Sequence, residues 1–355
     1  MTEETVFITG FPGFIASRLL GRLAREGGRF LLLVQPSFVE RAREELSHIA
    51  AAAGRNVSDF MLLPGDITAP DLGLSPADLQ TARAETTILF HLAAIYDLKV
   101  ARGTGMLVNV EGTRNVNQFA RSLPRLCHYH YVSTCYVAGK RTGVILESEL
   151  RHDAGFRNHY EETKYLAELE VEALKSELPV TIHRPSVVCG DSRTGETVKY
   201  DGIYYLIRYL LKWPSFLSAF NIGNKMVTLN LVPVDFVVEA MSALARDPLS
   251  IAKTVQLADP NPLTTQELFD TIARSLEGRR SLITIPAVLV ESSLMLPLSP
   301  RITDLPHSGV PYFFLKQTYD TTEAERLLKP HDVSCPPFHS YVKTIADYAA
   351  RNPTL

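Results

Sequence analysis

The chain has little cysteine, no long run of Lys or Arg, and no uninterrupted apolar stretch long enough to span a membrane. Its four cysteines among 355 residues are far apart and form neither a CxxC pair nor a zinc-type spacing with histidine: Cys127, Cys135, Cys189 and Cys335. We therefore expect reduced thiols, no bound metal and a cytoplasmic location.

The charge balance also excludes some classes of partner. A formal net charge of −3 and a pI near 6.4 give no electrostatic footprint for nucleic acid. The acidic start, residues 1–5, runs directly into an apolar strand and predicts no secretion signal. The most apolar late stretch, Leu282 to Leu298, is broken by Pro286, Glu291 and Pro297 and falls short of about 20 apolar residues, so it predicts no transmembrane segment. Core packing is the preferred interpretation of this stretch; peripheral contact with a membrane, or the wall of an apolar pocket, are the alternatives.

Short apolar segments alternate with amphipathic ones through the first half of the chain. The expected strands are 6–8, 30–34, 60–63, 87–92, 128–132 and 180–183, and the expected helices are 15–24, 38–53, 106–120 and 160–176. This alternation favours an α/β fold with a doubly wound parallel sheet, the Rossmann arrangement.

Beyond residue 190 the alternation loosens, and residues 229–245 then return to a strand followed by a helix. We therefore expect residues 1–190, continued by about 228–258, to form the Rossmann domain. Residues 191–227 and 259–355 are expected to form a smaller C-terminal substrate lobe built from insertions.

The first strand ends in a glycine-containing loop that reads TGFPGFIA over residues 9–16. Backbone N–H groups at a helix start bind pyrophosphate, and glycine at positions 10 and 13 permits a tight turn and close approach of phosphates. Because the loop joins a strand to a helix, it predicts a dinucleotide site contacted by Gly10, Gly13, Phe14 and Ile15.

About 20 residues later, an NAD site commonly carries an acidic residue for the ribose hydroxyls. This chain reads VQPS over residues 34–37, so no carboxylate there would repel a 2′-phosphate. Gln35 and Ser37 are hydrogen-bond donors, and Arg41 or Arg43 can add positive charge. The pattern favours NADP(H), with NAD(H) as the alternative.

A second motif reads NHYEETK over residues 158–164. A spacing of four puts the Tyr160 phenol and the Lys164 ammonium on one face of a helix, where a fixed positive charge lowers a phenol pKa normally near ~10. Such a tyrosine can donate a proton near neutral pH. With the cofactor loop, the pair predicts nicotinamide redox chemistry; the alternative is a solvated helix in which Lys164 only pairs with Glu161 or Glu168.

Together these motifs resemble the extended short-chain dehydrogenases/reductases over nearly the whole chain. The matching segments, in the order of the family, are 9–16, 65–67, 91–94, 109–115, 131–134 and 160–164. Within that superfamily, residues 183–196 and 199–205 are similar to the thioester reductase and fatty acyl-CoA reductase branch, which has a male-sterility-type NAD-binding domain.

The resemblance implies roles for further residues. Thr134, at the end of the strand before the catalytic tyrosine, would stabilise a carbonyl oxygen as it becomes an oxyanion, and Lys164 would also hold the nicotinamide ribose. Further cofactor contacts are implied for Asp66, Ile67, Ala93, Ala94, Asn109, Pro185, Ser186 and Val187. A turn or helix cap is the alternative for Asp66 and for Asn109. Cys135 is expected to be a buried apolar side chain and not a nucleophilic thiolate.

The implied function is an NADP(H)-dependent reductase that transfers hydride to an acyl thioester, on coenzyme A or a carrier protein, or to the derived aldehyde. The product would be an aldehyde and, after a second hydride, an alcohol. The alternative is a dehydrogenase or epimerase of the same superfamily acting on a hydroxysteroid-like or nucleotide-sugar substrate; a cofactor-binding sensor without turnover is more distant. The apolar stretches 203–211 and 282–298 favour the thioester, because a sugar nucleotide needs polar and cationic groups. Aromatic residues that would line an acyl channel, or alternatively form the core of the lobe, are Tyr200, Tyr204, Tyr205 and Trp213.

Overall fold

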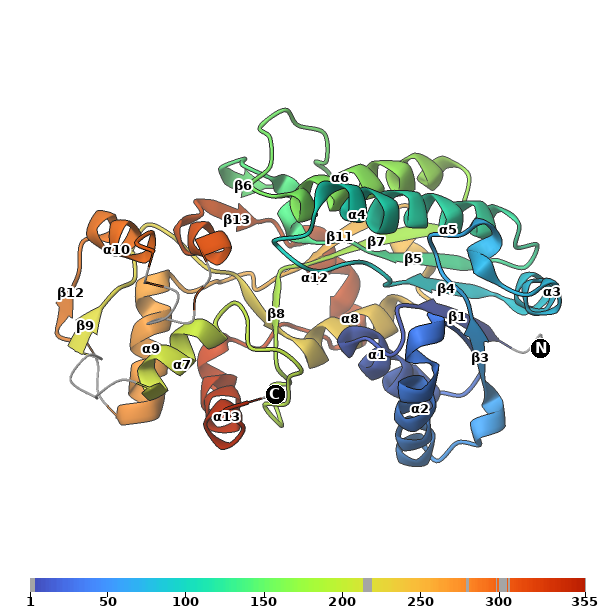
Figure 1. The fold of residues 1–355 in the computed structure, drawn as a ribbon, viewed down its shortest axis with the longest axis horizontal. Helices are drawn as coiled ribbons and strands as arrows, with labels where there is room; N and C mark the ends of the chain where they lie inside the picture. Colours follow the sequence, from blue (N-terminus) through green and yellow to red (C-terminus); the bar gives the residue numbers. More distant parts are fainter. Residues whose placement is uncertain are drawn as a thin grey trace.

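The computed structural model describes residues 4–212, 219–278, 281–297, 299, 305 and 307–354. Its larger part is a seven-stranded parallel sheet in the order β11-β7-β5-β4-β1-β2-β3, with helices on both faces (Figure 1). The strands are β1 (Thr5–Thr9), β2 (Arg29–Val34), β3 (Phe60–Pro64), β4 (Ile88–His91), β5 (His128–Val132), β7 (Val180–Pro185) and β11 (Thr254–Leu257). The doubly wound parallel sheet expected from the sequence is therefore confirmed.

Both faces of the sheet are buried, which explains why its strands are apolar runs without clean alternation. In β1, Val6 and Ile8 belong to the core on one face and Phe7 to the core on the other. The first face is covered by α1 (Phe14–Ala24), α2 (Val39–Ala53), α8 (Val234–Leu244) and α12 (Thr322–Leu328). The second face is covered by α3 (Pro76–Glu85), α4 (Arg102–Gly105), a π-helical segment (Met106–Glu111), α5 (Gly112–Arg121) and α6 (His159–Glu172).

Helix α3 was not expected from the hydrophobic pattern, because only Ala82 of its side chains is fully buried. Its start nevertheless carries a readable signal. Ser75 is the N-cap, its hydroxyl accepts a hydrogen bond from the Asp78 N–H at 3.1 Å, and Pro76 occupies the first helical position. Capping residues therefore mark this helix better than its periodicity does.

The C-terminal lobe lies beside the carboxyl end of the sheet (Figure 1). Its helices are α7 (Tyr204–Lys212), α9 (Thr265–Glu277), α10 (Ala287–Leu294) and α13 (Phe338–Arg351). Short parallel pairs complete the fold: β8 (Val187–Cys189) with β10 (Leu231–Pro233), β9 (Phe220–Asn221) with β12 (Ile283–Thr284), and β6 (Gly143–Ile145) with β13 (Gln317–Tyr319). The lobe has its own core, centred on Ile207, Phe269 and Ile345.

One segment within residues 259–355, expected to belong to the lobe, packs instead on the sheet. Helix α12 places Ala324, Leu327 and Leu328 in the same core as β1 and α8. Its start is held by Glu147, whose carboxylate accepts hydrogen bonds from the N–H groups of Glu323 at 2.6 Å and Ala324 at 3.1 Å. The chain thus returns to the Rossmann domain before it ends in α13.

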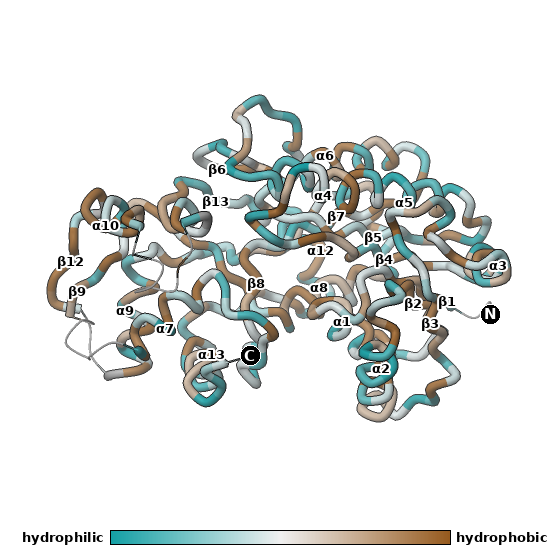
Figure 2. Tube along the Cα trace, in the orientation of Figure 1, coloured by the Kyte–Doolittle hydropathy of each residue, from teal (hydrophilic) through white to brown (hydrophobic). Residues whose placement is uncertain are grey.

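The apolar stretch that begins at Leu282 is only partly buried. It forms β12 and α10, in which Val290 and Leu294 are buried while Leu282 and Val288 are exposed (Figure 2 shows the brown, hydrophobic colour at these elements). Leu298 lies outside the described residues. Among the helices that the structure describes, none is both long and apolar enough to cross a membrane.

Three histidines are buried together between β5 and β7. His130 lies 3.0 Å from His183 through their ring nitrogens, and the rings of His128 and His130 have centroids 3.9 Å apart. Burial lowers the pKa of His128 to about 4 and that of His183 to about 3, and it also lowers the pKa of His130. The imidazoles are therefore neutral in the folded protein at neutral pH.

This cluster predicts a loss of stability on mild acidification. A histidine in the unfolded chain has a pKa of ~6.5. Between about pH 6.5 and 4, these three histidines therefore bind protons in the unfolded chain but stay neutral in the folded protein. As the pH is lowered through this range, the free energy of unfolding should decrease by up to about 1.4 kcal/mol per pH unit for each histidine. We expect His128→Gln to flatten this dependence between pH 6 and 5 in urea unfolding, and the exposed His48→Gln to leave it unchanged; equal slopes in both variants would contradict the account.

Candidate active site

The glycine loop forms a tight cradle at the carboxyl end of β1. Gly10 has φ +91°, and a Cβ there would lie 2.8 Å from the backbone nitrogen of Ala93. A Cβ on Gly13 would lie 2.6 Å from the carbonyl oxygen of Gly10. Gly13 is also the N-cap of α1, and neither a capping side chain nor an acidic residue occupies the first turn. The backbone N–H groups of this turn therefore suit an anionic group such as pyrophosphate.

A cavity of about 690 Å³, here called the cofactor cavity, extends from this cradle along the carboxyl edge of the sheet. Its volume is in the range of pockets for cofactors and small ligands. The predicted residues that line it are Gly10, Gly13, Phe14, Ile15, Gln35, Asp66, Ile67, Ala93, Ala94, Thr134, Tyr160, Lys164, Pro185, Ser186 and Val187. The fold thus brings together residues spread over most of the first 190 positions.

Two predicted cofactor residues are not in the lining. Ser37 lies in a short 3-10 segment after β2 and is exposed. Asn109 is buried, where its side chain accepts a hydrogen bond from the Ile95 N–H at 2.9 Å and donates one to the Thr163 hydroxyl at 3.0 Å. Asn109 therefore links the loop after β4 to helix α6 by hydrogen bonds. It does not line the cofactor cavity, and it does not cap a helix, the alternative considered from the sequence.

The end of the cofactor cavity near the carboxyl ends of β2 and β3 is lined by one acidic side chain, Asp66, and one basic side chain, Arg41. The Gln35 amide donates a hydrogen bond to the Asp66 carboxylate at 3.0 Å, and Arg41 from the first turn of α2 lines the same cavity. The sequence argument for NADP(H) used the absence of a carboxylate in residues 34–37 and the positive charge of Arg41 or Arg43 on the next helix. Asp66 brings a carboxylate to this end from the neighbouring strand, so the guanidinium of Arg41 becomes the main cationic group available for a 2′-phosphate.

Tyr160 lies in the first turn of α6, at the opposite end of the cofactor cavity. The helix begins at Asn158, whose side chain accepts a hydrogen bond from the Glu161 N–H at 3.0 Å. Tyr160 is buried, and burial raises the pKa of its phenol while a hydrogen bond with Thr134 acts in the opposite direction. The lowered pKa expected from the Tyr-Lys spacing is therefore not found, because desolvation outweighs the neighbouring groups.

Lys164, one helical turn after Tyr160, is also buried. Its Nζ donates hydrogen bonds to the Tyr131 hydroxyl at 2.8 Å and to the Val132 carbonyl at 2.9 Å. Burial lowers the pKa of Lys164 to about 7, although the negative charge of Glu168 raises it. Burial thus acts against the positive charge that was expected of this lysine from the sequence, and Glu168 acts in its favour.

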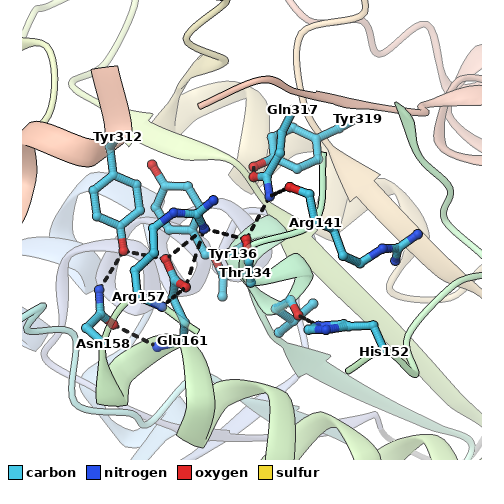
Figure 3. Close-up of polar contacts among 12 residues, drawn as sticks. Thr134, Tyr136, Arg141, His152, Arg157, Asn158, Glu161, Tyr312, Gln317 and Tyr319 are labelled. Atoms are coloured by element: carbon cyan, nitrogen blue, oxygen red, sulfur yellow. Dashed lines mark hydrogen bonds and ion pairs between the residues drawn. The ribbon is translucent and has the colours of Figure 1, made fainter. Parts of the chain in front are cut away.

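Two adjacent hydroxyls at the end of β5 have different partners. Ser133 donates to the buried carboxylate of Glu168, which also pairs with Arg184 through a 2.8 Å hydrogen bond from Nε. The Thr134 hydroxyl accepts a hydrogen bond from the Tyr136 N–H at 3.2 Å and lines the cofactor cavity (Figure 3). The structure therefore leaves Thr134, and not Ser133, available beside Tyr160.

Cys135 follows Thr134 but faces the protein interior. It is fully buried, its Sγ donates to the Arg184 carbonyl at 3.1 Å, and burial raises the pKa of its thiol. A thiol held in this way has no tendency to form the nucleophilic thiolate. Nor do the described residues contain a group of histidine, cysteine or acidic side chains that could hold a metal ion.

Two further cavities continue from the cofactor cavity into the lobe. The substrate-side cavity, of about 340 Å³, shares Tyr96, Tyr136, Val187, Lys199 and Asp201 with the cofactor cavity. A small apolar pocket of about 60 Å³ shares Tyr205, Leu305 and Phe313 with the substrate-side cavity and is also lined by Val290 and Leu294. Because neighbouring cavities share lining residues, the three spaces, here called the path, adjoin one another from the glycine loop and Tyr160 to the lobe.

Several residues of this path were not predicted from the sequence. The ring of Tyr96 packs edge-on against that of Tyr160, with centroids 5.2 Å apart, and Tyr312 comes from a 3-10 segment (His307–Phe314) far along the chain. Tyr96 and Tyr136 follow the carboxyl ends of β4 and β5, where ligand sites lie in such sheets, and this position was a usable signal. Of the aromatic residues considered for an acyl channel, Tyr205 lines the path, Tyr204 belongs to the lobe core, and Trp213 lies outside the described residues.

The fold and the site define an NAD(P)-dependent oxidoreductase of the extended short-chain dehydrogenase/reductase type. The family model described as "Male sterility protein" matches residues 8–241, and the chain belongs to this family. Both statements agree with the resemblance drawn from the sequence.

Known proteins similar to the chain include reductases of two kinds. It is 25% identical over 283 residues to glycine betaine reductase ATRR of Emericella nidulans, a match that covers 76% of this chain and 22% of that protein. It is 24% identical over 368 residues to fatty acyl-CoA reductase 1 of Arabidopsis thaliana, covering 82% of this chain and 75% of that protein. Among solved structures, the terminal R domain from the myxalamid PKS-NRPS biosynthetic pathway matches with a TM-score of 0.85 and 25% identity, over 100% of this chain and 92% of that one. The chain thus spans only about a fifth of the first of these relatives but most of the other two.

Proposed function

We propose that the protein is an NADPH-dependent reductase of acyl thioesters, carried on coenzyme A or on a carrier protein, that releases an aldehyde. The observation that carries this proposal is the row of adjoining cavities from the cofactor cavity, which Tyr160 and Thr134 line, to an apolar pocket of the lobe. A thioester carbonyl at Tyr160 would place its acyl chain towards that pocket. Likeness to a fatty acyl-CoA reductase and to a terminal R domain supports both carriers.

The side chains at the site suit reduction of a carbonyl group. A bound NADPH supplies the hydride. Tyr160 donates a proton to the carbonyl oxygen, Thr134 stabilises the negative charge that develops there, and Lys164 holds the nicotinamide ribose. After hydride and proton have been added, the C–S bond breaks, the thiol leaves with a proton, and an aldehyde remains. A second round on the aldehyde would give an alcohol.

We assign the recognition of NADPH to Arg41, the cationic side chain that lines the cofactor cavity beside Gln35. Arg41→Ala should raise KM for NADPH by about tenfold, the effect of losing one charge-assisted contact, and leave KM for NADH unchanged. Arg43→Ala is the matched control, because Arg43 pairs with Glu40 at 2.6 Å on the exposed face of α2. Equal KM values for NADPH in the wild type and Arg41→Ala would refute this assignment.

The proposed activity is tested by following NADPH and NADH absorbance with a panel of acyl-CoA thioesters of increasing chain length, free aldehydes and nucleotide sugars. Oxidation of NADPH with an acyl-CoA, absent in Tyr160→Phe, would support the proposal. Turnover of aldehydes alone would make the protein a carbonyl reductase. Turnover of a nucleotide sugar and of no thioester would overturn the proposal. The assignment of residues 191–227 and most of 259–355 to substrate binding predicts that substitutions there, at positions that do not line the cofactor cavity, change KM for the thioester and not for NADPH.

A further inference from the structure

One side chain of the lobe reaches the start of the catalytic helix. The Tyr312 hydroxyl donates a hydrogen bond to the Glu161 carboxylate at 2.6 Å and accepts one from the Asn158 amide at 2.6 Å (Figure 3). Asn158 in turn caps the helix at the Glu161 N–H. Tyr312, Glu161 and Asn158 therefore form a closed ring of hydrogen bonds around the first turn of α6, directly beside Tyr160.

The carboxylate in this ring is deeply buried and needs its partners. Glu161 has no exposed surface, and besides Tyr312 it accepts a hydrogen bond from the Arg157 N–H at 2.9 Å. Its ion pair with the Arg157 guanidinium is long, at 3.5 Å. A buried carboxylate that loses a hydrogen-bond donor must reorganise or be destabilised, and Glu161 directly follows Tyr160 in the chain.

The same tyrosine contacts the second catalytic element. The ring of Tyr312 packs on the ring of Tyr136, with centroids 4.6 Å apart, and the Tyr136 N–H donates to the Thr134 hydroxyl. Tyr312 also lines the substrate-side cavity, next to Phe313. A single residue of the lobe thus touches the cavity wall, the strand end that carries Thr134, and the helix that carries Tyr160.

The segment that carries Tyr312 is anchored on the Rossmann domain. Shortly after it, β13 pairs with β6, and the Gln317 amide donates hydrogen bonds of 2.7 Å to the carbonyls of Gly139 and Arg141. The Arg157 guanidinium also donates to the Gly139 carbonyl. These contacts attach the segment that follows Tyr312 to the Rossmann domain. The Tyr312 side chain is held in turn by its hydrogen bonds at the start of α6 (Figure 3).

We propose that Tyr312 is a positioning residue for the reaction, which acts through Glu161 to hold Tyr160 in place beside the substrate-side cavity. This inference rests on the proposed function only in taking Tyr160 as the proton donor. A proton donor must stay within about 0.5 Å of its productive position relative to the carbonyl, and the lobe supplies that constraint through one phenol.

The kinetic test compares Tyr312→Phe with Tyr319→Phe. Both remove one phenolic hydroxyl from the same region, but the Tyr319 hydroxyl donates to the anchoring residue Gln317 at 3.1 Å, and no hydrogen bond among the described residues joins it to Glu161 or Asn158. We expect Tyr312→Phe to lower kcat by about tenfold or more without changing KM for NADPH, and Tyr319→Phe to behave as the wild type. Equal kcat values in the two variants, with turnover present, would overturn the inference and leave the proposed function intact.

A double-mutant cycle identifies the route of the effect. If Tyr312 acts through Glu161, then Glu161→Gln with Tyr312→Phe should have the same kcat as Glu161→Gln alone. Additive losses of kcat would show that Tyr312 acts elsewhere and would reject the route.

A third measurement does not depend on finding a substrate. Hydrogen exchange of the amides in the first turn of α6, including that of Glu161, should be faster in Tyr312→Phe than in Tyr319→Phe by about tenfold, because the ring of hydrogen bonds is opened. Unchanged protection would overturn the inference. Absence of turnover by the wild type on every substrate would instead reject the proposed function, so the two failures are distinguishable.

Discussion

Replacing Tyr160 with phenylalanine is expected to lower kcat by about 10²- to 10⁴-fold, the range for loss of a general acid, while NADPH still binds. The phenol is the proton donor of the proposed reaction, and phenylalanine keeps the ring that packs edge-on against Tyr96. Burial raises the pKa of Tyr160, which keeps the proton on the phenol until the carbonyl oxygen becomes basic. The measurement is single-turnover oxidation of NADPH by an acyl thioester, with cofactor affinity determined separately by fluorescence.

The matched control is Tyr165→Phe, one turn further along the same helix. Tyr165 packs against His152 and Phe156, away from the cofactor cavity, and its hydroxyl has no part in the proposed reaction. We expect this variant to turn over as the wild type does. A Tyr160→Phe enzyme that retained wild-type kcat would remove the tyrosine from the mechanism, whereas a loss of NADPH binding in that variant would mean that the phenol serves the cofactor and not the carbonyl.

Replacing Arg184 with methionine is expected to lower the free energy of unfolding by about 3–5 kcal/mol, the usual cost of removing one partner from a buried ion pair. Arg184 and Glu168 are both almost completely buried, and the guanidinium also donates to the Glu149 carbonyl at 3.1 Å. Without Arg184, the Glu168 carboxylate would remain in the interior with the Ser133 hydroxyl as its hydrogen-bond donor among the described side chains. Urea unfolding of the two proteins measures the difference.

Two further variants separate the buried charge from other effects. Combining Arg184→Met with Glu168→Leu should recover much of the lost stability, because two charges replaced by apolar side chains leave no unpaired buried charge. Arg121→Met breaks the exposed pair with Glu177 and should leave the free energy of unfolding nearly unchanged. A double variant less stable than Arg184→Met would show that packing, and not the unpaired carboxylate, controls the cost.

The ion pair also lies one helical turn from Lys164, the residue proposed to hold the nicotinamide ribose. The charge of Glu168 raises the pKa of Lys164, whereas burial lowers it, and the balance leaves that pKa at about 7. The same carboxylate accepts a hydrogen bond from the Ser133 hydroxyl, whereas the Thr134 hydroxyl, in the same cavity, is the one that hydrogen-bonds Tyr160. A change at Glu168 is therefore expected to alter catalysis as well as stability.

The site is a mixture of residues that could and could not be predicted from the sequence. The glycine loop, Tyr160, Lys164, Thr134 and the residues after β7 were predicted, because each lies at a recognisable spacing within a short segment. Their cofactor and catalytic roles remain predictions. Ser37 and Asn109 were predicted at the cavity from their place in the sequence, and the structure puts them outside its lining because side-chain direction depends on the packing of whole elements.

The sequence by itself determined the class of fold and the order of its parts. Alternating apolar and amphipathic segments specify strands joined by helices, and such units pack in only one common way, with the glycine loop at the carboxyl edge. Tertiary structure alone decided the protonation preferences of Tyr160 and Lys164, the return of α12 to the sheet, and the contact of Tyr312 with Glu161. The physical reason is distance along the chain: desolvation and hydrogen bonding at these positions come from residues as far as 151 positions away, and local spacing carries no information about them.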